Sequence, residues 1–205
     1  MRNIKAIIFD LGGVVIDWSD DIVYRKAAKI SGIRFKKLQK AAEDEMDSFC
    51  KGKITETEFW RRALRKSGHP KNHVLLRLDR LWYHEYRKSA RLNREVIKII
   101  RKIRARYKVG VISNISPVHD AVNKKRRYYR YTDNEVLSHK VGIIKPDLRI
   151  YRIALKKLRC EPSECLFIDD KIRNVRGARK AGMNAAQFKD AARLKRDLKR
   201  FGIEV

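Results

Sequence analysis

Three aspartates directly follow runs of apolar residues. Asp10 ends the run Ala-Ile-Ile-Phe and precedes a pair of glycines, and Asp169 and Asp170 follow Leu-Phe-Ile. Runs of this kind are typical of buried parallel strands, whose carboxyl ends meet at the edge of the sheet where α/β folds bind ligands. Carboxylates gathered there can attack a phosphoryl group and hold Mg²⁺. The sequence therefore predicts a site built around these three side chains.

Four short apolar runs predict the strands that position the site, at residues 4–9, 109–112, 165–168 and 184–188. Helical periodicity follows at residues 94–106, 147–158 and 172–181. Residues 193–200 predict an amphipathic surface helix, with Leu194, Leu198 and Phe201 on its apolar face. Strands that alternate with helices predict an α/β fold, a doubly wound parallel sheet of Rossmann-like type.

The interval 18–92 differs from the rest of the chain. It has helical periodicity without a convincing strand, contains all three tryptophans and divides into about four helices. Thr55 and Glu58 predict a capping box at one helix start. We expect residues 1–17 and 93–205 to form the core, and residues 18–92 to form an all-helical cap that closes over the strand ends. The tryptophans are expected to pack within this cap.

The charge balance is strongly basic. Lysine and arginine number 51 against 24 acidic residues, a formal net charge of +27. Such an excess cannot be paired within the chain, so it indicates anionic surroundings: nucleic acid, acidic lipid or an ion-rich cytoplasm. Residues 124–131 alternate basic and aromatic types, a pattern that can track a phosphate backbone and stack bases. The favoured interpretation of this run is a solvated helix face whose tyrosines point inward.

Several functional classes are disfavoured. No run of 18 apolar residues exists, so we expect no membrane span, and Asp10 interrupts the short apolar run near the amino terminus, which argues against a secretory signal. Cys50, Cys160 and Cys165 fit no zinc-site spacing. We interpret them as free thiols and predict a cytoplasmic location.

Four motifs occur in order along the chain. Phe9-Asp10-Leu11-Gly12 comes first, then Val111-Ile112-Ser113-Asn114, then Gly142 to Asp147 with Lys145 at its centre, and then Phe167-Ile168-Asp169-Asp170 with the glycines of residues 174–183 behind it. Together they resemble the haloacid dehalogenase superfamily, and the helical interval matches the family's cap between the first two motifs. The resemblance covers the whole chain. It implies a phosphomonoester hydrolase, acting on a small substrate such as a sugar phosphate or a nucleotide.

The resemblance also implies residue roles. Asp10 would attack phosphorus and form an aspartyl-phosphate. Lys145 and Ser113 would hold the phosphoryl oxygens together with Asn114. Mg²⁺ would be bound by Asp10, the carbonyl of Gly12, Asp170 and Asp169, the last directly or through water, with Asn174 behind them. His119 and His139 have no place in this chemistry and are predicted to pack.

One position departs from the family pattern. Most phosphatases of this family carry a second aspartate two residues after the nucleophile, which protonates the leaving group, and here Gly12 stands there. Loss of such an acid typically forfeits a factor of about 10²–10⁴ in rate. Three explanations are open. A branch similar to glucose-1-phosphate phosphatases has the same Asp-Leu-Gly; Asp17, Asp20 or Asp21 of the cap can replace the acid; or the chain is catalytically weak.

Two alternative functions follow. A weakly catalytic chain with this charge is a nucleic-acid-associated binding protein on the same fold. A 2-haloacid dehalogenase is a lesser alternative, because a halide leaves without a proton. In that family pattern neutral residues replace the metal carboxylates, whereas Asp169 and Asp170 are both present here. Two uncompensated carboxylates beside an anionic nucleophile favour Mg²⁺ and phosphate over halide.

Overall fold

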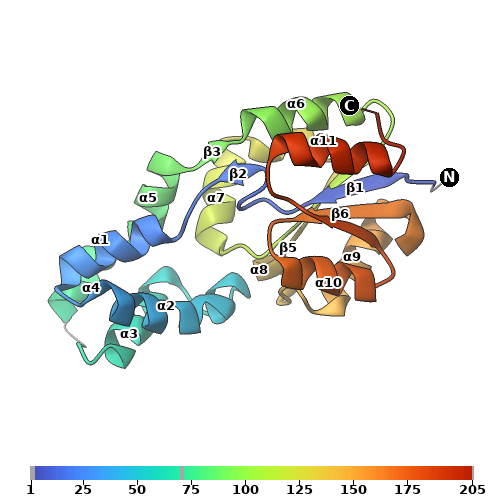
Figure 1. The fold of residues 1–205 in the computed structure, drawn as a ribbon. Helices are drawn as coiled ribbons and strands as arrows, with labels where there is room; N and C mark the ends of the chain where they lie inside the picture. Colours follow the sequence, from blue (N-terminus) through green and yellow to red (C-terminus); the bar gives the residue numbers. More distant parts are fainter. Residues whose placement is uncertain (1–2, 70–71, 205) are drawn as a thin grey trace.

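A five-stranded parallel sheet forms the centre of the core in the computed structural model, which describes residues 3–69 and 72–204 (Figure 1). Its strand order is β5 (Asn134–Leu137), β4 (Lys108–Ser113), β1 (Ala6–Phe9), β6 (Cys165–Asp169) and β7 (Asn184–Gln187). The central strand β1 pairs with β4 and β6, so that Phe9 lies opposite Val111 and Ile168. The predicted doubly wound parallel fold is confirmed.

Helices cover both faces of the sheet. The helices α6 (Arg94–Ile103) and α11 (Ala191–Arg200) lie on one face, and α9 (Leu148–Leu158) and α10 (Ile172–Lys180) on the other (Figure 1). Alternate residues of β1 face opposite sides of the sheet. Ile7 and Phe9 pack in the apolar core under α6 and α11, and Ala6 and Ile8 pack in the apolar core under α9 and α10. Leu194 and Leu198 of α11 are buried as predicted.

The edge strand β5 was not predicted. Its sequence, Asn-Glu-Val-Leu, opens with two half-buried polar residues, because it lies at the rim of the sheet and pairs only with β4. The predicted helix 94–106 ends earlier, at Ile103, and the strands β4 and β6 extend one residue further than predicted, to Ser113 and Asp169. Both extensions bring a polar site residue into the last position of a strand.

The helical interval forms a second body beside the core (Figure 1). Its described residues, 18–69 and 72–92, form five helices rather than about four: α1 (Asp21–Ser31), α2 (Phe35–Cys50), α3 (Glu56–Lys66), α4 (Asn72–Leu78) and α5 (Leu81–Ser89). The break between α4 and α5 comes at Arg80, which adopts a left-handed conformation without a glycine or proline to signal it. Trp60 and Trp82 are fully buried in this body, as predicted.

The predicted capping box of α3 forms only in half. The Thr55 hydroxyl accepts a hydrogen bond from the Glu58 amide at 3.2 Å. The Glu58 carboxylate instead pairs with Arg61 and Arg62 on its own helix. Long basic side chains three and four residues ahead compete for the carboxylate that a capping box would use.

Two of the connections between the helical body and the core involve the backbone directly. The chain leaves and returns through a two-stranded antiparallel ribbon of β2 (Ile16–Asp17) and β3 (Arg91–Leu92). At the end of α2, the Ser138 hydroxyl of α8 (Ser138–Val141) donates to the Cys50 carbonyl at 2.6 Å. Gly52, two residues after Cys50, packs so tightly against α8 that a Cβ there would lie 2.8 Å from the His139 carbonyl oxygen.

The basic and aromatic run at 124–131 is a packing element. It spans the end of α7 (Pro117–Lys125) and the short 3₁₀ helix η1 (Tyr128–Tyr131). Tyr131 is buried, Tyr128 and Tyr129 pack against the core, and the Tyr129 hydroxyl donates to Asp120 at 2.9 Å. The inward-facing interpretation is therefore confirmed, and these rings are not free to stack on bases.

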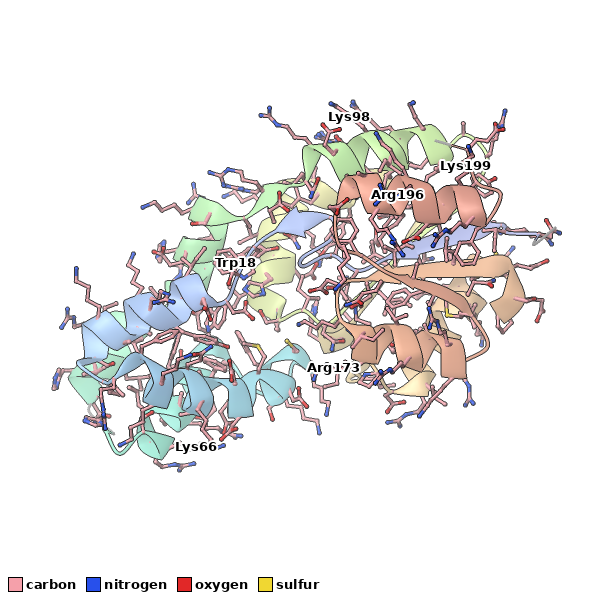
Figure 2. All side chains as sticks on the ribbon, in the orientation of Figure 1. Trp18, Lys66, Lys98, Arg173, Arg196 and Lys199 are labelled. Carbon is pink, nitrogen blue, oxygen red and sulfur yellow. The ribbon has the colours of Figure 1, made fainter. Side chains whose placement is uncertain are left out.

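Other basic side chains project outward from both bodies. Figure 2 shows them on both bodies, with Lys66 on the helical body and Lys98, Arg173, Arg196 and Lys199 on the core. Within residues 3–69 and 72–204, no helix is long and apolar enough to cross a membrane. Cys50, Cys160 and Cys165 are free thiols.

The start of α5 yields a prediction about stability. The Glu56 carboxylate accepts a hydrogen bond from the Trp82 amide at 2.7 Å, and burial raises the pKa of Glu56 to about 7. Proton uptake then favours the folded state fully below the ordinary pKa of glutamate, and this contribution disappears as the pH rises through 7. We expect Glu56→Gln to raise Tm relative to wild type at pH 8 and to match it near pH 5.

Glu58→Gln is the matched control in thermal melts. Hydrogen bonds from Arg62 and Arg61 lower the pKa of Glu58, so it is ionised at both values of pH. Its replacement should change Tm by the same small amount at pH 5 and pH 8. A pH-independent effect of Glu56→Gln would contradict the prediction.

Candidate active site

Three adjacent strands deliver the polar residues of the site. Asp10 follows β1, Ser113 ends β4 and Asp169 ends β6, and β1 lies between the other two. Because the strands are parallel, these carboxyl ends share one edge of the sheet. Asp10, Ser113 and Asp169 are all buried, which their apolar strands impose on them.

Lys145 links two of these aspartates. Its ammonium lies 2.9 Å from Asp10 Oδ1 and 2.7 Å from Asp169 Oδ2, and it donates to the Ile112 carbonyl at 2.9 Å. Only 1% of Lys145 is exposed, so the cation is held inside the protein. Its three N–H groups are thus matched with three acceptors.

Asn114 fixes the backbone of Lys145. Its side-chain oxygen accepts from the Lys145 amide at 2.7 Å, and its Nδ2 donates to the Lys145 carbonyl at 3.0 Å. These two hydrogen bonds hold the loop that carries the lysine, while the predicted contact of Asn114 with substrate stays a prediction.

Asn174 of α10 supports Asp169. Its Nδ2 contacts both carboxylate oxygens, at 3.0 and 3.1 Å, and the Lys171 amide donates to Asp169 Oδ1 at 2.8 Å. With Lys145, these donors occupy both oxygens of Asp169. These contacts favour the orienting role, one of the two roles open to Asp169 from the sequence, and its role as a metal ligand stays a prediction.

Asp170 has a different environment. Its Oδ1 is buried without a hydrogen-bond partner among the described residues, and Gly13 packs against its carboxyl group. Two features require glycine at position 13. A Cβ there would lie 2.9 Å from Asp170 Oδ2, and the backbone has φ +77°, which other residues rarely adopt. The second glycine of the first motif therefore makes room for this carboxylate.

The three carboxylates offer ligand atoms within 4.8 Å of one another, from Asp10, Asp169 and Asp170. All the ligand atoms are oxygens, which a hard divalent cation prefers, and the buried Oδ1 of Asp170 has no hydrogen-bond donor among the described residues. The residues present thus fit a magnesium-like ion. Gly12, predicted to contribute its carbonyl, lies exposed in the loop after Asp10.

Electrostatics reflect the crowding of negative charge. Burial raises the pKa of Asp10 to about 7, with Lys145 opposing and Asp169 and Asp170 adding to the rise. Burial also acts to raise the pKa of Asp169, but the Lys145 ammonium outweighs it and holds that pKa below its usual range. Burial and the charge of Asp169 raise the pKa of Asp170. One lysine therefore does not compensate three carboxylates.

Comparison with known proteins decides the family. Residues 4–182 match the haloacid dehalogenase-like hydrolases. The chain belongs to this family.

Three similar proteins illustrate the relationship. A sesquiterpene phosphatase of Aspergillus oryzae is 24% identical, with 91% of each chain covered. A D-ribitol-5-phosphate phosphatase of Bacteroides thetaiotaomicron is 24% identical, with 95% of this chain and 97% of the relative covered. A HAD family enzyme of the same bacterium, solved with magnesium and inorganic phosphate, has a TM-score of 0.74 at 24% identity, covering 93% of this chain and 98% of that chain.

The two histidines lie outside the haloacid dehalogenase-like site. His119 is buried with its ring 4.2 Å from that of Tyr86, and burial lowers the pKa of His119 to about 3. His139 Nε2 lies 3.2 Å from Asp120. Both pack, as predicted.

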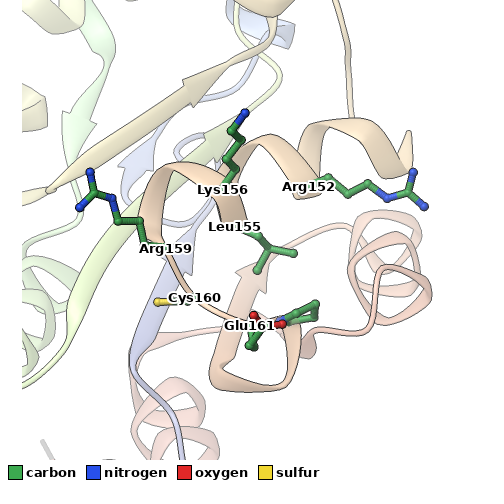
Figure 3. A pocket seen from close by; sticks show the side chains of 7 residues that line it. Arg152, Leu155, Lys156, Arg159, Cys160 and Glu161 are labelled. Carbon is green, nitrogen blue, oxygen red and sulfur yellow. The ribbon is translucent and has the colours of Figure 1, made fainter.

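Two surface pockets are also distinct from the strand-end site. One of about 520 Å³ lies at the end of α9 and beside the 3₁₀ helix η2 (Pro162–Glu164), as Figure 3 shows. It is lined by Arg152, Leu155, Lys156, Arg159, Cys160, Glu161 and Pro162. The other, of about 690 Å³, lies behind the Lys145 loop and is lined by Pro146, Asp147, Leu148, Arg173, Arg176, Gly177 and Lys180. Neither contains a strand-end aspartate.

Several supporting contacts were not predicted. The Tyr151 hydroxyl donates to the Asn174 carbonyl at 2.8 Å, and Ser138 joins the Ile115 amide to the Cys50 carbonyl of the helical body. Serine and tyrosine at these positions carry no distinctive spacing, since their partners are backbone atoms far away in the sequence. The glycine pair after Asp10 was noted in the sequence, but the close approach of Gly13 to Asp170 was not predicted.

Gly177 yields a prediction about the site. A Cβ there would lie 2.8 Å from Pro146 Cβ, 2.9 Å from the Tyr151 hydroxyl and 3.0 Å from the Pro146 carbonyl oxygen. We expect Gly177→Ala to displace the loop that carries Lys145, to lower stability by about 1–3 kcal/mol and to reduce turnover. Thermal melts and a phosphatase assay measure the two effects.

Gly12→Ala is the control for stability, since a Cβ at Gly12 meets no atom within 4 Å. It should leave Tm nearly unchanged. Equal losses of Tm in the two variants would contradict the steric explanation.

Proposed function

We propose that this hydrolase is a Mg²⁺-dependent phosphatase that cleaves a small phosphomonoester through an aspartyl-phosphate on Asp10. The observation that carries the proposal is the buried Lys145 between Asp10 and Asp169, next to the unpartnered oxygen of Asp170. The substrate class, a sugar phosphate or a nucleotide, accords with the ribitol phosphate named for one relative. The finer similarity to glucose-1-phosphate phosphatases stays a prediction.

Asp10 is the proposed nucleophile. Its Oδ1 is held by the Leu11 amide at 2.7 Å and by Lys145, which leaves Oδ2 to attack phosphorus. Asp10, Asp170 and the Gly12 carbonyl would hold the ion, with Asp169 oriented behind them. The bound ion would supply positive charge that keeps Asp10 ionised and admits an anionic phosphoryl group.

Ser113 and Lys145 are the proposed phosphoryl contacts. The Ser113 hydroxyl makes no side-chain hydrogen bond to another described residue, so it is free to donate to a phosphoryl oxygen. Lys145 has no spare donor while Asp10 is a carboxylate. When Asp10 becomes an acyl phosphate it loses its negative charge, which departs with the leaving oxygen, while the attached phosphoryl group stays anionic. We propose that one Lys145 N–H then turns from Asp10 to a phosphoryl oxygen.

Water then hydrolyses the aspartyl-phosphate on Asp10 and releases inorganic phosphate. The helical body, residues 18–92, is the proposed cap that selects the substrate, and residues 1–17 and 93–205 form the proposed catalytic core. A cytoplasmic location fits the three free thiols.

The two alternatives have weaker support. Nucleic-acid binding rested partly on the aromatic run at 124–131, whose rings are packed inward. A dehalogenase needs no cation, yet Asp170 here has a buried oxygen that lacks a partner. Solved dehalogenases resemble this chain at identities of about 20%, a level that shows the shared fold alone.

The first test measures phosphate release from p-nitrophenyl phosphate and from a panel of sugar phosphates and nucleotides. We expect wild-type turnover with Mg²⁺, loss of turnover with chelator, and loss to the buffer level in Asp10→Asn, because the amide cannot attack phosphorus. Turnover that survives in Asp10→Asn would refute the proposed nucleophile.

The second test measures metal binding without turnover. We expect Mg²⁺ to raise the Tm of the wild-type protein, because binding to the folded state stabilises it by mass action. Asp170→Asn should abolish most of this rise, since it removes one of the anionic ligands. Asp44→Asn, a change of an exposed aspartate on the helical body, is the matched control and should keep the rise. An equal rise in all three proteins would place the ion elsewhere.

A further inference from the structure

The site as described lacks a proton donor for the leaving group. Gly12 occupies the position of the usual acid, and the space beside it is open, since a Cβ there would meet nothing within 4 Å. Asp10 and Asp169 are bound to Lys145, and Asp170 faces the carboxylate cluster. Outside this cluster, the carboxylates nearest to Gly12 in sequence are Asp17 on the connecting ribbon and Asp20 and Asp21 at the start of the helical body.

Two of these three aspartates are engaged elsewhere. Asp17 is exposed on the connecting ribbon and accepts a hydrogen bond from Asn93 at 3.3 Å. Asp21, the first residue of α1, accepts from Gln39 of α2 at 3.2 Å. Both serve contacts within or beside the helical body.

Asp20 is held differently. Its Oδ1 accepts a hydrogen bond from Trp18 Nε1 at 2.8 Å, and its Oδ2 has no hydrogen-bond partner among the described residues. The Trp18 ring is fixed edge-on against Tyr86, at 4.9 Å between centroids, and lies 6.1 Å from His119. One oxygen of Asp20 is thus anchored through an indole, and the other is free to hold a proton.

Trp18 places Asp20 close to the strand ends. Figure 2 shows Trp18 at the junction between the two bodies, and its ring lies 6.1 Å from that of His119 on α7, the helix that begins shortly after Ser113 and Asn114. The end of α2 docks on the same stretch of chain, because the Ser138 hydroxyl donates to the Cys50 carbonyl and accepts from the Ile115 amide. The charge of Lys171, the residue after Asp170, also acts on Asp20 and opposes the rise in its pKa that burial causes.

We propose that Asp20 is the general acid and base of this phosphatase, in place of the aspartate that Gly12 lacks. This inference rests on the proposed function. As the bond between phosphorus and the ester oxygen breaks and the bond from Asp10 forms, the Asp20 proton passes to that oxygen and an alcohol leaves. The Asp20 carboxylate then takes a proton from the water that attacks the aspartyl-phosphate, so phosphate is released and both aspartates are restored.

The surroundings suit this cycle. Burial raises the pKa of Asp20, the Trp18 hydrogen bond and Lys171 oppose the rise, and Asp21 and Glu43 add to it. The charged groups that act on Asp20 are thus Lys171 from the core, Asp21 from α1 and Glu43 from α2. A carboxyl group with a raised pKa keeps a larger protonated fraction near neutral pH.

The test compares substrates that differ in their need for a proton. A p-nitrophenolate leaves without protonation, whereas the alkoxide of a sugar phosphate does not. We expect Asp20→Asn to lower kcat/KM for the best sugar phosphate of the panel by roughly 10²–10⁴-fold and to change kcat/KM for p-nitrophenyl phosphate far less, because kcat/KM reports the steps up to departure of the leaving group and not the later hydrolysis, which both substrates share. A series of aryl phosphates should show a steeper dependence on leaving-group pKa in the variant.

Asp21→Asn and Asp17→Asn are the matched controls, and both should keep wild-type rates on both substrates. Retained turnover of p-nitrophenyl phosphate shows that Asp20→Asn is folded. Equal losses on the two substrates, or no loss on either, would overturn the role of Asp20. A wild-type protein without turnover dependent on Asp10 would overturn the proposed function and this inference together, so the two failures are distinguishable.

Discussion

The buried ammonium of Lys145 is the interaction on which the strand-end site depends. Asp10 and Asp169 come from neighbouring strands and are buried because those strands are, so their charges would repel at short range without a cation between them. Much of the surrounding structure serves to place this one group. The Asn114 side chain bonds to the backbone amide and carbonyl of Lys145, and Pro146 packs close to Gly177. The Ile112 carbonyl accepts the third hydrogen bond of the ammonium.

The residues of the site were predictable because each stands where an apolar run ends. Asp10, Ser113 and Asp169 follow from strand position alone, and the spacing of the later motifs adds Lys145 and Asp170. Their division of labour was not predictable. Whether Asp169 binds a metal or a lysine depends on side-chain directions across several elements, and no local pattern encodes those directions.

The parts of the fold that escaped prediction share a physical cause. The strand β5 lies at the sheet edge, so its first half does not need to be apolar. The break before α5 falls on Arg80 in a left-handed conformation that glycine usually marks. The capping box failed because Arg61 and Arg62 attract the Glu58 carboxylate. In each case a tertiary or electrostatic contact outweighs the local preference.

The two-residue ribbon of β2 and β3 carries a consequence for how this protein can change. Both passages of the chain between the core and the helical body run side by side there, with Ile16 opposite Leu92 and Asp17 opposite Arg91. The chain therefore enters and leaves the helical body at one place on the surface of the core. That body can be exchanged as a unit, since the new ends need only meet two neighbouring points. The nucleophile and the other strand-end carboxylates would stay with the core, whereas Asp20 would leave with the exchanged body, so each new body would have to bring its own proton donor.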